Sequence, residues 1–196
     1  MSSLRIEERF PVAAPPEQVF AFLLDPERIV ACMPGAALDE VESERVFLGS
    51  VRVKLGAVTL VYKGRLELSE VDDAGHRVRA VGEGREKGGA GKVKLRLDAR
   101  VDGDGAGGSQ VTVEAEVELA GRIVRFGRGM IESVAKQLFG AFAEAVRARL
   151  GAAAETGAGT EPAAAPSAAN NDAAPIRGLP LLLRALWDAL VRLFQR

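Results

Sequence analysis

One long segment of the chain has an unbroken helical period of apolar residues. It runs from Gly127 to Leu150, and its polar side chains fall mostly outside the apolar stripe. The stripe consists of Ile131, Val134, Ala135, Leu138, Phe142, Val146 and Leu150. Apolar positions at spacings of three and four line one side of a helix, so this segment predicts a long amphipathic helix that packs against another element.

Before this helix, apolar and polar residues alternate with a period of two. Residues 4–12 predict a first strand, which Pro11 places at a sheet edge because proline has no ladder donor. Pro15-Pro16 and Asp25-Pro26 open two short predicted helices. From Val41 onward, alternating runs are separated by turns rich in Gly and Asp. The pattern predicts an α+β fold, in which six to seven antiparallel strands form a curved sheet around the long C-terminal helix.

The last two predicted strands carry opposite charges on their outer faces. One strand before the glycine-rich segment 103–108 is basic, and the strand after it is acidic. If that segment is a hairpin loop, Arg96 lies near Glu116 and Lys94 near Glu118, each pair contributing about 0.2–1 kcal/mol. The loop also matches GxGxxG formally, but that motif binds dinucleotides where it opens a helix, so we interpret it as a turn.

After Leu150 the composition changes, and the domain is predicted to span residues 1–150. Residues 151–179 are rich in Ala, Gly and Pro and predict a disordered linker. Residues 180–196 predict a second amphipathic helix, too short and too charged to cross a bilayer. An interfacial membrane anchor is favoured, while docking on a partner's groove or on its own domain stays open. The anchor residues are Leu181, Leu182, Leu183, Arg184, Leu186, Trp187, Leu190, Val191, Arg192, Leu193 and Phe194.

Composition excludes several classes of function. The chain has 26 Lys and Arg against 27 Asp and Glu, so no basic field favours nucleic acid. The single cysteine, Cys32, and the single histidine, His76, give neither an internal disulfide nor a metal site. His76 follows a turn, where we expect it to be exposed, and no nucleophile and base are paired locally. Charges in the first ten residues disfavour a signal peptide and predict a cytoplasmic protein.

The predicted interior supplies the positive functional signal. A long helix across a strongly curved sheet leaves a space between them, and an apolar space with one hydroxyl group suits a hydrophobic ligand. The alternative is that these side chains simply fill the core. The candidate lining residues are Phe22, Met33, Leu60, Tyr62, Met130, Val134 and Leu138.

Four segments of the sequence resemble one known family. They are residues 31–38 (ACMPGAAL), 51–68, 82–91 (GEGREKGGAG) and 118–142, with an Ala-Gly-Arg element before the long helix. The order of elements resembles the START-like (SRPBCC) helix-grip superfamily, and these segments resemble its carbon monoxide dehydrogenase G-subunit family (CoxG-like). The resemblance covers about residues 4–150.

The resemblance implies a non-catalytic accessory protein with no metal of its own. Such a protein would recruit a molybdenum-containing carbon monoxide dehydrogenase, or a related hydroxylase, to the inner face of the cytoplasmic membrane as a peripheral membrane protein. With the predicted apolar space and the predicted tail, we hypothesise that it tethers the enzyme, carries a quinone (menaquinone or ubiquinone) that links the enzyme to the respiratory chain, or does both. The alternatives are a lipid-binding or lipid-transfer module without a redox partner, and a helix-grip cyclase or hydrolase that uses Tyr62, Glu83 or His76.

Overall fold

The structure is a computed structural model that describes residues 2–156 of the 196-residue chain. The predicted anchor and most of the predicted linker therefore lie outside the described residues. The strands are β1 (Ser2–Val12), β2 (Ala36–Ser43), β3 (Val46–Leu55), β4 (Val58–Asp72), β5 (Arg77–Glu86), β6 (Lys92–Gly103) and β7 (Ser109–Ala120). The helices are α1 (Pro16–Leu24), α2 (Pro26–Cys32), the 3₁₀ helix η1 (Arg122–Phe126) and α3 (Arg128–Thr156).

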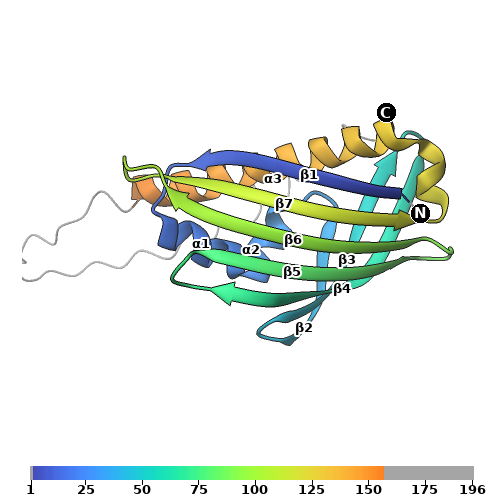
Figure 1. Ribbon diagram of the computed structural model, residues 1–196, viewed down its shortest axis with the longest axis horizontal. Helices are drawn as coiled ribbons and strands as arrows, with labels where there is room; N and C mark the ends of the chain where they lie inside the picture. Colours follow the sequence, from blue (N-terminus) through green and yellow to red (C-terminus); the bar gives the residue numbers. More distant parts are fainter. Residues whose placement is uncertain (1, 157–196) are drawn as a thin grey trace, which may run out of the picture. The chain divides into compact units, whose positions relative to one another are not determined.

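The strands form one antiparallel sheet of seven strands in the order β1-β7-β6-β5-β4-β3-β2 (Figure 1). Short turns connect each strand to the next from β2 through β7. The last strand, β7, then pairs with the first strand, β1. The predicted helix-grip arrangement is confirmed, with β1 at an edge as Pro11 indicated. Two boundaries differ from the prediction, since β2 already begins at Ala36 and α3 continues to Thr156. The helix η1 was not predicted.

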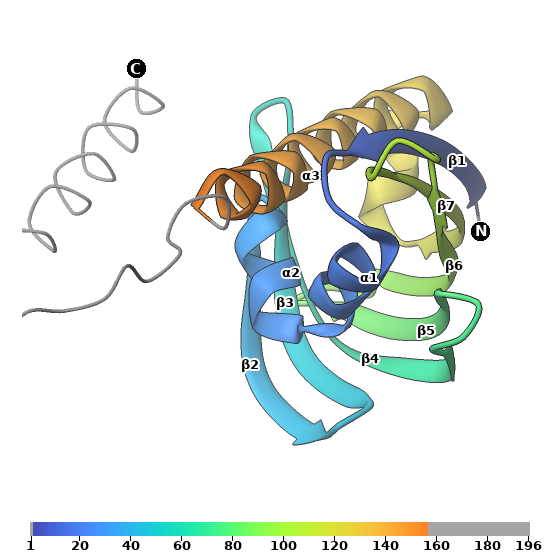
Figure 2. The same ribbon diagram turned by 90° about the vertical axis from the view of Figure 1, so that its left-hand side faces the viewer.

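Glycines allow the sheet to curve around its helices (Figure 2). Gly49 pairs with Gly64, and Gly64 pairs with Gly84, so three neighbouring strands lack side chains along one line. A Cβ at Gly49 would lie 2.6 Å from the carbonyl oxygen of Ala37, and one at Gly84 would lie 2.8 Å from Cγ1 of Val93. Larger residues would push these strands apart, so the glycines permit the close approach that curvature requires.

The buried apolar residues form two separate clusters. The first cluster lies where α1 and α2 meet the end of α3, and it includes Phe10, Val19, Phe20, Phe22, Cys32, Val111, Phe142, Val146 and Leu150. The second cluster lies near the start of α3, and it consists of Leu4, Leu55, Leu60, Tyr62, Leu119, Ile123 and Ile131. The predicted stripe of α3 contributes to both clusters, because a helix of this length spans the sheet.

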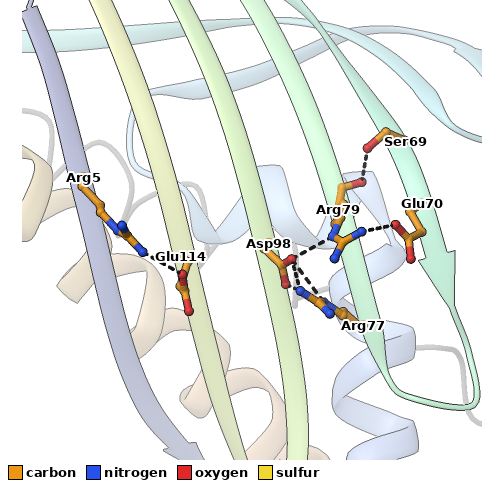
Figure 3. Close-up of polar contacts among 7 residues, drawn as sticks. All are labelled: Arg5, Ser69, Glu70, Arg77, Arg79, Asp98 and Glu114. Carbon is orange, nitrogen blue, oxygen red and sulfur yellow. Dashed lines mark hydrogen bonds and ion pairs between the residues drawn. The ribbon is translucent and has the colours of Figure 1, made fainter.

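The outer face of the sheet carries paired charges (Figure 3). Arg77 and Arg79 of β5 both donate to Asp98 of β6, with Nε–Oδ distances of 2.8 and 2.9 Å. Arg5 of β1 pairs with Glu114 of β7 at 3.3 Å. The hydrogen bonds from Arg77, and then from Arg79, lower the pKa of Asp98 despite its partial burial. Such cross-strand pairs of charged side chains are typical of a solvated sheet face.

The hairpin of β6 and β7 has the predicted register. Arg96 is opposite Glu116, and the two side chains pair at 3.7 Å. Lys94 is opposite Glu118 as predicted, but its ion pair is with Glu83 of β5 at 3.8 Å. Since β6 has neighbours on both sides, a long lysine side chain can reach either one.

Candidate functional site

Four apolar side chains between the two clusters keep part of their surface uncovered. Val51, Leu66 and Leu95 have the same strand parity as buried neighbours, so they face the inner side of the sheet. Leu138 lies on the inward stripe of α3. All four are half-buried, and none packs against either cluster. We call these four residues the inner band, and its exposed apolar surface is where an apolar ligand would gain most by burial.

Glycines lie beside the inner band and are closely packed against its side chains. Gly82 lies between Leu66 and Leu95 in the sheet register, and Gly64 and Gly84 occupy the same inner face. A Cβ at Gly82 would be 3.2 Å from Cδ1 of Leu66 and 3.4 Å from Cβ of Leu95. Glycines inside strands commonly mark a place where another group approaches closely, so they are the sequence signal for this site.

The structure divides most of the predicted cavity residues between the two clusters. Phe22 belongs to the first cluster, and half-buried Met33 packs against it. Leu60 and Tyr62 belong to the second cluster, and half-buried Val134 packs against it. These five side chains therefore lie at the two ends of the interior.

The remaining two predicted residues have different environments. Leu138 is half-buried and lies in the inner band. Met130 is 44% exposed in the first turn of α3, one position away from buried Ile131. The prediction did not include Val51, Leu66 or Leu95, although their inward parity was visible in the strand pattern.

A polar pair lies next to the inner band. Tyr62 is opposite Val51 on one side and Glu86 on the other. The side chain of Glu86 is 1% exposed, and its Oε1 accepts a hydrogen bond from Nε of Arg122 at 3.0 Å. Burial, and then the charge of Glu86, raise the pKa of Tyr62, while Arg122 opposes this shift. Among the described residues, neither Oη of Tyr62 nor Oε2 of Glu86 has a hydrogen-bond partner.

Three closely packed glycines lie beside this polar pair. Gly91 follows the turn after β5, and a Cβ there would lie 2.5 Å from Oε2 of Glu86. Gly121 precedes Arg122 with φ of 95°, and a Cβ there would lie 2.5 Å from Cα of Gly91. Gly89 also lies against the Glu86 carboxylate. The glycine-rich segment 82–91 and the Ala-Gly-Arg element thus meet at Glu86, which explains their residue types physically.

The residues considered for catalysis do not come together. Glu83 lies on the outer face with a side chain that is 77% exposed. The expectation that His76 is exposed is wrong, because its half-buried ring lies 5.6 Å from that of Phe20. Buried Cys32 lies 2.6 Å from Nη1 of Arg149. Of these residues, Tyr62 alone lies next to the inner band.

Two features are absent from residues 2–156. No group of three or more His, Cys, Asp or Glu side chains is placed to hold a metal ion there. None of the helices in this part of the chain has the length and hydrophobicity needed to span a membrane. The predicted anchor residues in 180–196 lie outside the described part, so their membrane role stays a prediction.

Solved structures resemble the domain at low sequence identity. A conserved protein from Geobacillus kaustophilus matches with a TM-score of 0.69 and 19% identity, covering 76% of this chain and 97% of that one. The ZhuI aromatase/cyclase from Streptomyces sp. R1128 matches with a TM-score of 0.61 and 17% identity, covering 81% of this chain and 100% of that one. A START superfamily protein from Mycobacterium smegmatis matches with a TM-score of 0.55 and 12% identity, covering 76% of this chain and 98% of that one. At these identities the similarity shows a common fold.

The family comparison is more specific. No curated protein sequence matches the chain. Residues 9–151, however, match the family described as the G subunit of carbon monoxide dehydrogenase (CoxG), a span that runs from β1 to α3. It contains the inner band, the polar pair and the three glycines beside Glu86. The chain therefore belongs to the carbon monoxide dehydrogenase G-subunit (CoxG) family.

Proposed function

We propose that this protein is a non-catalytic accessory protein that binds a quinone against the inner band. The observation that carries this proposal is the half-buried apolar surface of Val51, Leu66, Leu95 and Leu138 between two closed clusters. A flat apolar ring buried there would gain roughly 25 cal/mol for each Å² of apolar surface removed from water. Menaquinone and ubiquinone both carry such a ring.

The family membership supports the choice of partner. We propose that the protein recruits a molybdenum-containing carbon monoxide dehydrogenase, or a related hydroxylase, to the inner face of the cytoplasmic membrane. Residues 180–196 would supply the membrane contact. In their sequence Arg184, Asp188 and Arg192 recur at every fourth position among apolar residues, which is the pattern of an interfacial helix. The bound quinone would then connect the enzyme with the respiratory chain.

A catalytic role has weaker support. The aromatase/cyclase has the same fold, but this likeness extends to the fold alone at 17% identity. Glu83 is on the outer face and His76 is in the turn beside Phe20, so only Tyr62 of the three candidates is placed to meet a ligand. An accessory role requires no such group.

Liposome co-sedimentation with lipid extraction tests both parts of the proposal. The full chain is compared with a chain that ends at Thr156, where α3 ends, on neutral and on anionic vesicles. A third protein carries Arg184→Glu and Arg192→Glu, which keep the length of the tail and reverse its charge. Bound small molecules are extracted from each sample and identified by mass spectrometry.

We expect only the full chain to sediment, with a preference for anionic vesicles that the charge-reversed protein loses. We also expect both the full and the shortened chains to retain a quinone after expression in a quinone-producing cell. If phospholipid is extracted in place of quinone, the protein is a lipid-binding module. If all three proteins stay in solution, the tail docks on a protein.

A further inference from the structure

The buried pair of Tyr62 and Glu86 has unused hydrogen-bonding capacity. Oε1 of Glu86 accepts from Nε of Arg122, whereas Oε2 has no partner among the described residues. Oη of Tyr62 also has none, and both side chains are almost fully buried. A buried polar atom without a partner costs about 1–3 kcal/mol, so such atoms usually indicate a missing water, ion or ligand.

The two free atoms have complementary roles. A carboxylate oxygen can only accept a hydrogen bond, whereas a neutral phenol can donate one. Burial raises the pKa of Tyr62, which keeps its donor proton in place at neutral pH. One hydroxyl group placed between them would satisfy both atoms, because it accepts from Tyr62 and donates to Glu86. A carbonyl or ether oxygen would satisfy Tyr62 alone.

We propose that Tyr62 and Glu86 bind a hydroxyl group on the ring of the apolar ligand, whose remaining surface packs on the inner band. The sheet register supports this arrangement, because Tyr62 lies directly between Glu86 and Val51 of the inner band. Arg122 pairs with the other carboxylate oxygen of Glu86, so a Glu86 carboxylate has a charge partner in the buried site. The inference rests on the proposed function, since it concerns the polar end of the same ligand in its reduced quinol form, which carries hydroxyl groups where the quinone has carbonyl oxygens.

Binding of two matched probes to the full chain tests this inference. 2-Naphthol and 2-methoxynaphthalene share one apolar ring system, but only 2-naphthol has a donor. An apolar site without the polar pair would prefer the ether, because the hydroxyl group must leave water. We expect the reverse here, with 2-naphthol bound about five- to a hundredfold more tightly, as the cost of an unpaired acceptor implies.

Three variants distinguish the polar pair from the apolar surface. Glu86→Gln keeps the shape, and its carbonyl can face Arg122 while its amide donor faces the ligand, so we expect the preference for 2-naphthol to disappear. Tyr62→Phe should weaken 2-naphthol and reduce the preference. Leu138→Ala removes only apolar contact from the inner band, so it should weaken both probes equally. Circular dichroism confirms that each variant is folded.

Each other outcome has a definite meaning. If the wild-type protein binds the ether as tightly as 2-naphthol, a retained water satisfies the pair; this inference is then wrong and the proposed function stands. The same holds if Glu86→Gln keeps the full preference. If neither probe binds, the apolar ligand site itself is absent, and the proposed function and this inference both fail.

Discussion

Tyr62 is a residue whose ionisation can be followed alone, because the chain has one tyrosine. Its pKa is raised above the ordinary 10.0 by burial and by Glu86. The folded state therefore favours the neutral phenol. We expect the 295 nm absorbance of the native protein to rise at a higher pH than in denaturant, where the ordinary pKa returns.

The same shift links Tyr62 to stability at high pH. Because folding raises this pKa, the stabilisation is complete below pH 10.0 and is lost as the pH rises through the folded value. Tyr62→Phe has no ionising group, so its stability should fall less between pH 9 and pH 12 in urea titrations. A native titration at the ordinary pKa would show that Tyr62 is not buried.

Gly121 is a residue that tolerates no side chain. Its φ of 95° strains any L residue, and a Cβ would meet Cα of Gly91 at 2.5 Å. We expect Gly121→Ala to lower the free energy of unfolding by about 2 kcal/mol or more, measured by urea denaturation.

Gly140 in α3 is the matched control, because a Cβ there meets no atom within 4 Å. Gly140→Ala should raise stability by roughly 0.5–1 kcal/mol, since alanine loses less backbone entropy in a helix. If the two substitutions had equal effects, the close approach of Gly121 and Gly91 would not exist.

The elements were more predictable than the site. Strict alternation showed which strand residues face inward, and the charges of β6 and β7 correctly predicted that Arg96 lies opposite Glu116. The parity that placed Val78 and Ala80 inward also applies to Glu86 in the same strand. An acidic residue is normally read as solvated, so the only signal for its burial was that parity.

Other features depend on contacts that no local pattern encodes. Arg122 reaches Glu86 because η1 follows Gly121 and turns the chain back over the end of β5. The two clusters draw their members from elements that are far apart in the sequence, and the paired glycines beside them lie on three separate strands. Periodicity predicts the inward side of an element but not how closely another element covers it.

Two leucines of α3 separate ligand binding from stability at the level of one element. Leu150 is 2% exposed in the first cluster, so Leu150→Ala should cost about 2–5 kcal/mol of unfolding free energy. Leu138 is half-buried and packs on neither cluster, so Leu138→Ala should cost roughly 1 kcal/mol. Urea denaturation measures both.

Ligand affinity should show the opposite order for these two variants. Leu138→Ala should weaken 2-methoxynaphthalene several-fold, because the probe loses apolar contact, whereas folded Leu150→Ala should bind it normally. Equal losses of affinity would mean that the inner band is not the ligand site. A large loss of stability in Leu138→Ala would mean that its side chain is already covered by the protein.

At the scale of the whole molecule, the inner band lies between the two clusters, and the polar pair adjoins it where Tyr62 of the second cluster is opposite Val51. If the ligand is a quinone, this site distinguishes its two redox forms. The oxidised form presents carbonyl oxygens, which leave Oε2 of Glu86 without a donor. The reduced form presents hydroxyl groups, which satisfy both Tyr62 and Glu86.

The reduced form should therefore bind more tightly, and the protein should raise the midpoint potential of the quinone that it holds. For a two-electron couple, each tenfold preference corresponds to about 30 mV. Redox titration of 2-methyl-1,4-naphthoquinone with saturating protein measures this shift, and Glu86→Gln should remove most of it. An unchanged or lowered potential, with binding retained, would mean that the ring sits on the inner band with its oxygens away from Glu86. A raised potential would make the protein an acceptor that draws electrons from its partner enzyme more readily than free quinone does.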